Sequence, residues 1–303
     1  MAEDKEKSLT DETLPKEPEE TSASWDWDAA VPQTDTSNIT LDDLQETEEK
    51  VVEQPAEEPE ENETEKEEEA PASNPDDDGL CIVCGKENPS GEFRYLCEDC
   101  ANKPFITQVE RCKRCAEIVS MPCSICAKCA SDELYFEKSL VVCEYADAGR
   151  SLVLELKYHG GIYVAEDMAR LLNRVANFRE YFDGAILVPA PLHSKRMRKR
   201  AYNQSEVFCR AIVNLYPELN LKVENLLLRK KFTPTQTALS KKDRIENVRG
   251  AFAVNGGLNI LKSAKIIVAD DVMTSGATLN ECARTLKRAG FENISAFAFA
   301  RRS

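Results

Sequence analysis

Residues 266–278 read IIVADDVMTSGAT, and this stretch decides the fold that the rest of the chain must satisfy. It begins with an apolar run that has the length and composition of a buried strand. From residue 134 onward, helical patterns such as QSEVFCRAIVNLY and LNECARTLKRAGF alternate with strand-like segments. This alternation predicts an α/β fold with a parallel sheet and helices on both of its faces.

Two acids end the apolar run. A strand predicted over residues 265–269 places Asp270 and Asp271 at its carboxyl end, which is where parallel sheets bind their ligands. Paired carboxylates can hold the hydroxyl groups of a sugar, either directly or through Mg²⁺. Buried carboxylates are rare without partners, so a purely structural strand would explain the pair poorly.

The loop after the acids has the composition of a phosphate site at the start of a helix. A helix N-terminus presents free N–H groups and partial positive charge, and a glycine lets the backbone close around an anion. The predicted phosphate contacts are Thr274, Ser275, Gly276, Ala277 and Thr278. Together with the acid pair, they predict a sugar phosphate as ligand. The sequence lacks the motifs of P-loop NTPases and of dinucleotide-binding folds, which argues against those classes.

Nine of the twelve cysteines fall between residues 81 and 129, with the spacing of metal ligands. Two CxxC pairs supply the four thiolates of one tetrahedral Zn²⁺ site. The first predicted site consists of Cys81, Cys84, Cys97 and Cys100. The second segment has five thiols for four positions, and the favoured set is Cys112, Cys115, Cys126 and Cys129. The alternative set uses Cys123 with Cys126. Because the segment contains no His, we expect two closed, structural zinc sites.

Charge divides the chain near residue 78. Residues 1–78 hold 29 Asp and Glu against 5 Lys, a net charge of −24, whereas residues 79–303 hold 25 acids and 34 Lys and Arg, a net charge of +9. The first segment has too few large apolar residues to offset the entropy of folding, so we expect a disordered acidic tail. We therefore expect three parts: the tail over 1–78, a double zinc ribbon over 79–131 and an α/β domain over 132–303.

The beginning of the sequence has neither the basic segment nor the apolar core of a secretory signal. No apolar run reaches the ~20 residues that are needed to span a bilayer. We therefore expect a soluble, cytoplasmic protein that does not insert into a membrane.

Several separated motifs give the chain a resemblance to the ComF family, the competence-associated proteins that combine a double zinc ribbon with a type I phosphoribosyltransferase domain. The apolar strand, the acid pair and the TSG loop resemble the signature of that transferase superfamily. Further matches are LKYHG at 156–160, VPAPLHSKRMRKRAYNQS at 188–205 and LLRKKFTPTQTALSKKDRIENVRGAF at 227–252. The paired CxxC motifs also match. The resemblance covers about residues 80–303 and makes 132–303 the transferase-like domain.

The resemblance implies binding of phosphoribosyl pyrophosphate with Mg²⁺, and transfer of its phosphoribosyl group to an acceptor that no residue identifies. Asp270 and Asp271 would be the catalytic pair at the ribose hydroxyls, and 274–278 would hold the 5-phosphate. The departing diphosphate would meet Pro189, Ala190, Pro191, Leu192, His193, Lys195 and Arg196. Where the family has RGFNQ this sequence has RAYNQ, and Ala201 in place of glycine would stiffen the loop.

A second interpretation assigns the stretch HSKRMRKRAYNQ, residues 193–204, to single-stranded DNA. A basic run with an aromatic residue can follow a phosphate backbone and stack a base. The ComF family is linked to DNA uptake with a helicase-like partner. The predicted DNA contacts are Arg198, Lys199, Arg200 and Tyr202. In this interpretation the phosphoribosyl pyrophosphate site is a ligand sensor or a relic. The tail would compete with DNA for the basic part of the chain.

Overall fold

The computed structural model describes residues 79–88, 91–103, 111–119, 125–131, 133–231 and 241–302. The predicted acidic tail and Cys123 lie outside the described residues. Every described residue belongs to one structural unit, Lys66–Ser303. No helix in these ranges combines the length with the apolar character that crossing a bilayer requires.

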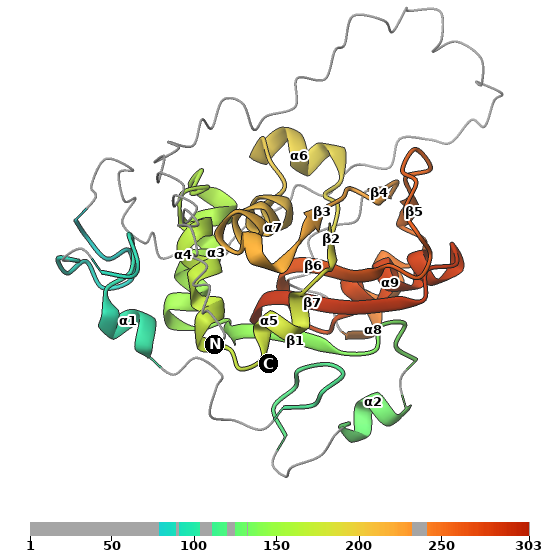
Figure 1. Ribbon diagram of the computed structural model, residues 1–303, viewed down its shortest axis with the longest axis horizontal. Coiled ribbons are helices and arrows are strands. Elements are labelled where there is room, and N and C mark those ends of the chain that lie inside the picture. Colours follow the sequence, from blue (N-terminus) through green and yellow to red (C-terminus); the bar gives the residue numbers. More distant parts are fainter. Residues whose placement is uncertain are drawn as a thin grey trace, which may run out of the picture. The chain divides into compact units, whose positions relative to one another are not determined.

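A parallel sheet forms the centre of the described chain. Its strands are β1 (Ser139–Glu144), β2 (Ile186–Pro189), β3 (Lys222–Val223), β6 (Lys265–Met273) and β7 (Asn293–Arg301). They are ordered β1-β7-β6-β2-β3, and each neighbouring pair is parallel. Figure 1 shows β6 and β7 running side by side. Two short strands, β4 (Leu227–Arg229) and β5 (Phe252–Val254), form a separate antiparallel pair.

Helices occupy most of the connections between strands, which confirms the predicted α/β class. Before β1 lie the one-turn helices α1 (Glu98–Asn102) and α2 (Ala127–Ser131). Between β1 and β3 lie α3 (Asp147–Tyr158), α4 (Val164–Arg170), η3 (Leu171–Arg174), α5 (Phe178–Phe182), α6 (Ser194–Arg200), α7 (Gln204–Leu215) and η4 (Pro217–Leu219). Further along the chain are α8 (Lys241–Val248) and α9 (Ala277–Arg288).

The apolar run of β6 is continuous because both faces of the sheet are buried. Ile267 and Ala269 pack in a core cluster with residues of α3, α4 and α7. Ile266 and Val268 point the other way and pack in a second cluster with residues of α9. The alternation follows from the two-residue period of a strand, and it lets helices cover both faces of the sheet.

The strand that carries the acid pair is longer than its sequence pattern predicts. β6 continues to Met273 instead of ending at Ala269, because β7 still offers partners there: Asp270 pairs with Ala298. On its other side, β2 ends at Pro189, opposite Ala269. From Asp270 onward the described chain therefore provides no strand on that edge of β6, and side chains from other elements can reach the acids.

The first cysteine-rich segment is joined to the α/β part by buried polar contacts. Asp167 of α4 is 1% exposed, and its carboxylate accepts hydrogen bonds from the backbone N–H groups of Arg94, at 3.0 Å, and Tyr95, at 2.7 Å. Burial raises the pKa of Asp167, and the two N–H groups oppose that rise. The ring of Tyr95 also contacts that of Tyr163, with 4.5 Å between centroids. These contacts fix the segment to α4 and to the residue that precedes it.

Candidate functional site

The acid pair of β6 is held by two side chains that come from other elements. Asp271 Oδ2 lies 3.1 Å from Nζ of Lys157, near the end of α3. Asp270 Oδ1 accepts hydrogen bonds from the hydroxyl of Ser205, at 3.1 Å, and from the backbone N–H of Asp271, at 2.9 Å. The side chains of Lys157 and Asp271 are only 19% and 11% exposed. The pair is thus a preorganised, largely desolvated group at the carboxyl end of the sheet.

The charges at this site are not balanced. Burial and the neighbouring carboxylate of Asp271 raise the pKa of Asp270 to about 7, although Lys157 and the two hydrogen bonds act in the opposite direction. Burial lowers the pKa of Lys157, but its attraction to Asp271 and Asp270 outweighs burial, so that pKa is raised. One ammonium therefore faces two carboxylates. Such a group favours ligands that bring hydroxyl donors or a divalent cation.

Hydrogen bonds connect the acid pair to the turn predicted to meet the diphosphate. The backbone N–H of Ala190 donates to Ala269 O at 2.7 Å, and Ala190 O accepts from Nδ2 of Asn203 at 3.1 Å. Asn203 Oδ1 in turn accepts from the N–H of Ser205 at 3.1 Å, and the Ser205 hydroxyl reaches Asp270. The turn therefore begins beside the acids and is fixed to them through buried polar groups.

The rest of that turn leads into the short helix α6, where the sequence predicts a loop. Pro189 ends β2, and Pro191 and Leu192 follow it half-buried, without regular structure. The ring of His193 caps α6, because its Nδ1 accepts from the N–H of Lys195 at 3.2 Å. Desolvation and the surrounding cations, led by Arg229, lower the pKa of His193. We therefore expect this imidazole to be neutral near pH 7.

Arginines from two elements gather beside the turn. Burial, together with the charges of Arg229 on β4 and Arg200 on α6, lowers the pKa of Arg196. Burial also lowers the pKa of Arg229, while the charge of Asp270 acts against that change. An arginine whose pKa is lowered by burial or by neighbouring cations gains free energy when an anion binds beside it. Arg229 lies close enough to Asp270 to interact with its charge, so the cluster can receive a phosphate or diphosphate near the acid pair.

The loop predicted to bind phosphate lies between β6 and α9. Gly276 caps α9 with a φ of 77°, a left-handed conformation that a residue with a Cβ adopts only with strain. The hydroxyl of Ser275 accepts from the N–H of Ala277 at 3.4 Å. Thr274 O accepts from Nη1 of Arg301 at 2.7 Å, and Thr278 lies half-buried in the first turn of α9. The loop thus begins at the end of β6, two residues beyond the acids, and leads into the N-terminus of a three-turn helix.

The residues predicted to contact DNA differ in their accessibility. Arg198 is exposed on α6, and the side chain of Lys199 lies outside the described residues. The hydroxyl of half-buried Tyr202 donates to Leu156 O at 2.6 Å.

Arg200 holds a different aromatic ring. Its guanidinium lies 5.1 Å from the centroid of Tyr158, which is 53% exposed. Nη1 of Arg200 also donates to Gln204 at 3.2 Å. The aromatic surface that solvent reaches at the end of α3 is therefore that of Tyr158.

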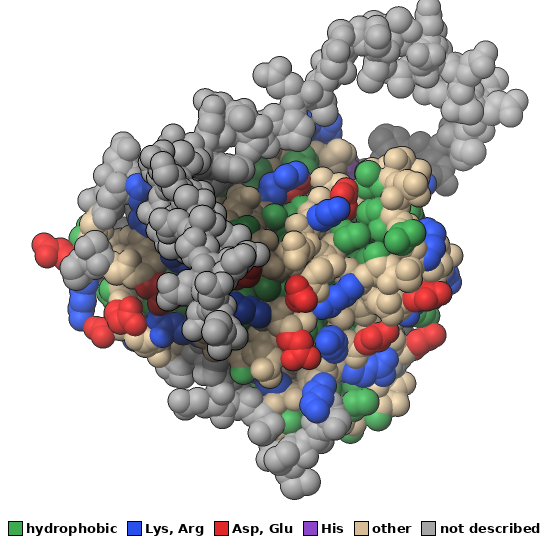
Figure 2. Space-filling model, in the orientation of Figure 1, with side chains coloured by type: hydrophobic (Ala, Val, Ile, Leu, Met, Phe, Trp, Pro, Cys, Tyr) green, Lys and Arg blue, Asp and Glu red, His purple; other side chains and the backbone are tan. Residues whose placement is uncertain are grey.

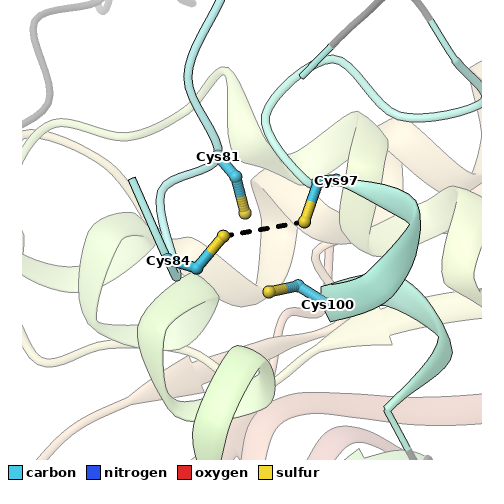
Figure 3. Close-up of side chains that lie close together, drawn as sticks. All are labelled: Cys81, Cys84, Cys97 and Cys100. Carbon is cyan, nitrogen blue, oxygen red and sulfur yellow. Dashed lines mark hydrogen bonds between the residues drawn. The ribbon is translucent and has the colours of Figure 1, made fainter. Parts of the chain in front are cut away.

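Two groups of four cysteines bring their sulfur atoms together, and within each group all four lie within 4.8 Å of one another. The groups are Cys81, Cys84, Cys97 and Cys100, and Cys112, Cys115, Cys126 and Cys129. Figure 3 shows the first group, with the side chains pointing toward one centre. All eight thiols are free of disulfides. Four thiolates with no open position are the donor set of a structural Zn²⁺ site, so both groups can bind zinc.

Backbone N–H groups lower the pKa of one thiol in each group, which favours the thiolate form that binds a metal. The N–H of Lys86 lowers the pKa of Cys84 to about 7. Burial raises the pKa of Cys112, but N–H donors outweigh it and bring that pKa to about 6; the first of them is Cys126 N, 3.2 Å from the sulfur. Burial and the neighbouring sulfurs raise the pKa of Cys129. Four thiolates this close together require a cation to neutralise them.

Several residues of the site were not singled out from the sequence. Lys157, Asn203 and Ser205 all lie within motifs that carry the family resemblance, LKYHG and RAYNQS, so their place in those motifs was an available signal. Arg301 contacts the loop 274–278 from the end of β7, 27 residues away along the chain. No local pattern in the sequence marks that contact.

Comparison with known proteins finds relatives named for competence and DNA utilization. Competence protein F of Haemophilus influenzae is 27% identical over 225 residues, which cover 73% of this chain and 96% of that protein. DNA utilization protein YhgH of Salmonella typhimurium is 26% identical, covering 74% and 97%. Competence protein ComFC of Streptococcus pneumoniae is 26% identical, covering 73% and 99%. No family model matches the chain. These relatives confirm the resemblance to the ComF family.

Proposed function

We propose, from this relationship to the ComF family, that the chain is a cytoplasmic protein of DNA uptake that binds phosphoribosyl pyrophosphate. The observation that carries the proposal is the meeting of three complementary parts at one end of the sheet. A carboxylate pair with an excess of negative charge lies on β6. The N-terminus of α9 follows it, and the arginine cluster of α6 and β4 borders it. Ribose hydroxyls, 5-phosphate and diphosphate are the groups these parts select.

Asp270 and Asp271 would bind the ribose 2- and 3-hydroxyls, and residues 274–278 would hold the 5-phosphate. The turn 189–193, with Lys195 and Arg196, would face the diphosphate. Mg²⁺, when bound with the substrate, would neutralise diphosphate oxygens, as hard cations do with few protein ligands. The two cysteine groups would hold structural Zn²⁺, so residues 79–131 would form a double zinc ribbon ahead of a transferase-like domain over 132–303.

Transfer to an acceptor would follow from the same arrangement. Breaking the bond at C1 leaves an oxocarbenium-like ribose and concentrates negative charge on the departing diphosphate. Arg196 and Arg229 would stabilise that charge, because they are already held beside the turn before the substrate arrives. Asp270 and Asp271 would keep the ribose in place while the bond breaks.

Calorimetric titration with phosphoribosyl pyrophosphate and Mg²⁺ tests the proposal. The wild type should bind, and the double variant Asp270→Asn, Asp271→Asn should lose binding. The control is Asp183→Asn, which removes an exposed acid from the turn before β2 and should leave binding intact. A folded, zinc-loaded wild type that does not bind would refute the proposal. If it binds, release of pyrophosphate with candidate acceptors tests transfer.

A second candidate function is binding of single-stranded DNA, in which the phosphoribosyl pyrophosphate site serves as a sensor. The observation that favours it is the exposed ring of Tyr158 beneath Arg200, next to the basic helix α6. Figure 2 shows Lys and Arg side chains on the surface in the area where Figure 1 places α6. Such a surface can follow a phosphate backbone while an aromatic ring stacks a base.

Substitution of Tyr158 separates stacking from charge. Tyr158→Ala should weaken binding of a fluorescent oligothymidine by roughly five- to 150-fold, because stacking contributes about 1–3 kcal/mol per base. Tyr158→Phe retains the ring and should bind like the wild type. Anisotropy titrations at two salt concentrations measure both variants. Equal affinities of Tyr158→Ala and wild type would exclude this ring as a DNA contact.

A further inference from the structure

Arg301 joins the phosphate loop to the second cysteine group. It lies at the end of β7 and is only 2% exposed. Nη1 donates to Thr274 O at 2.7 Å, at the start of the loop, and Nη2 forms an ion pair with the carboxylate of Glu117. One buried guanidinium therefore contacts both the loop and the cysteine-rich segment.

Glu117 is part of the turn that brings Cys112 and Cys115 together. Its carbonyl oxygen accepts from the N–H of Cys112 at 2.9 Å, and the N–H of Ala116 donates to Cys112 O at 2.9 Å. An isolated bridge between Arg111 and Ile118 closes the turn. The position of the Glu117 carboxylate therefore depends on this turn, and the turn is ordered when its cysteines hold a metal.

A buried guanidinium is stable only where a carboxylate and hydrogen-bond acceptors compensate for its lost hydration. For Arg301, the carboxylate of Glu117 pairs with the positive charge at Nη2, and Thr274 O accepts the hydrogen bond from Nη1. If Glu117 moves or is removed, the guanidinium loses its counter-charge and must shift to form a new contact. Its hydrogen bond to Thr274 O would then change as well. We propose that the second cysteine group positions the phosphate loop, with Glu117 and Arg301 as the positioning residues.

A second ion pair between the same turn and the sheet provides a matched control. Arg111 pairs with Glu144 at the end of β1, and its Nη1 donates to Ala116 O at 2.7 Å. Glu144 is 30% exposed and Glu117 is 31% exposed, so the two carboxylates are equally accessible. The Arg111–Glu144 ion pair and the hydrogen bond from Arg111 to Ala116 O involve no residue of 274–278. Removing either carboxylate weakens the attachment of the turn, but only the loss of Glu117 should disturb the loop.

Amide hydrogen exchange of the ligand-free, metal-loaded protein tests the proposal. Glu117→Ala should speed exchange in peptides over residues 273–279 by about tenfold, and Glu144→Ala should leave those peptides unchanged. Releasing the metal from the wild type with a chelator should give the same acceleration. It should add little in Glu117→Ala, because the connection is already broken. Equal exchange in the two variants, or an undiminished chelator effect in Glu117→Ala, would overturn it.

The consequence for binding rests on the proposed function. Glu117→Ala should raise the Kd for phosphoribosyl pyrophosphate about fivefold or more, whereas Glu144→Ala should stay within about twofold of the wild type. If the wild type does not bind this ligand, the proposed function fails. The exchange experiment still decides whether Glu117 and Arg301 position the loop.

Discussion

Replacing Asp270 with Asn should stabilise the ligand-free protein at alkaline pH and have little effect in acid. The side chain of Asn has nearly the same shape, and its oxygen can still accept from the hydroxyl of Ser205 and the N–H of Asp271. What the substitution removes is the negative charge of a buried carboxylate beside that of Asp271. The cost of that charge is the quantity that the experiment measures.

The expected magnitude follows from the pKa of Asp270, which burial and then Asp271 raise from 3.8 to about 7. Each unit corresponds to about 1.4 kcal/mol, so ionising this group costs the folded protein at most about 4 kcal/mol. Because the folded pKa is the higher one, this contribution to stability is fully present below about pH 4 and is lost as the pH rises through 7. The Asn variant has no such proton to lose. Its advantage over the wild type should grow by about 2–3 kcal/mol between about pH 5 and pH 8.

Urea unfolding of both proteins at the two pH values measures this difference. The control Asp183→Asn removes a charge from an exposed position and should shift the midpoint equally at both pH values. The advantage of Asp270→Asn could prove to be the same in acid and in base, or the variant could be less stable than the wild type at pH 8. Either result would show that burial and Asp271 do not raise the pKa of Asp270.

Three further results are expected. Ala201→Gly should raise the free energy of unfolding by about 0.5–1 kcal/mol, because Ala201 ends α6 with a φ of 65°; a lower urea midpoint would contradict this. Lys157→Met removes an ammonium that lies 3.1 Å from Asp271 and whose charge also lowers the pKa of Asp270. The pKa of Asp270 should therefore rise by about one unit or more, and the loss of stability with rising pH should extend to higher pH, measured by urea unfolding at several pH values between about 5 and 9. Chelation should release two Zn²⁺ per chain, counted by native mass spectrometry, and should make the eight clustered thiols reactive; fast thiol reaction before chelation would exclude closed sites.

The parallel sheet could be predicted because its central strands carry the signal locally. An apolar run as dense as that of β6 is buried on both faces whatever its neighbours are. The end of β6 could not be predicted, because it depends on pairing with β7, and Asp270 remains in the strand only because Ala298 lies opposite. The spacing of the cysteines was similarly local, and among the described residues the four sulfur atoms of each favoured set lie together.

The partners of the acid pair lie far from it along the chain. Lys157 precedes Asp271 by more than a hundred residues, and Ser205 comes from a different helix. No periodicity encodes such contacts, because they arise where the sheet brings the ends of its connections together. The sequence also does not show that the exposed ring is Tyr158 and not Tyr202, because both tyrosines lie close to basic residues along the chain. Their exposure is decided by tertiary contacts, such as the hydrogen bond from Tyr202 to Leu156 O.

The place of β7 in the sheet has a consequence for how the protein is made. β7 lies between β1 and β6, although about 150 residues separate it from β1 along the chain. At a translation rate of about 5–20 residues per second, β1 has no strand to pair with for roughly 8–30 s after its own synthesis. During that interval its edge and the apolar side chains beneath it are open to other nascent chains, as is the edge of β6 until β7 emerges. Chaperone binding during translation should therefore concentrate before Asn293–Arg301 leaves the ribosome.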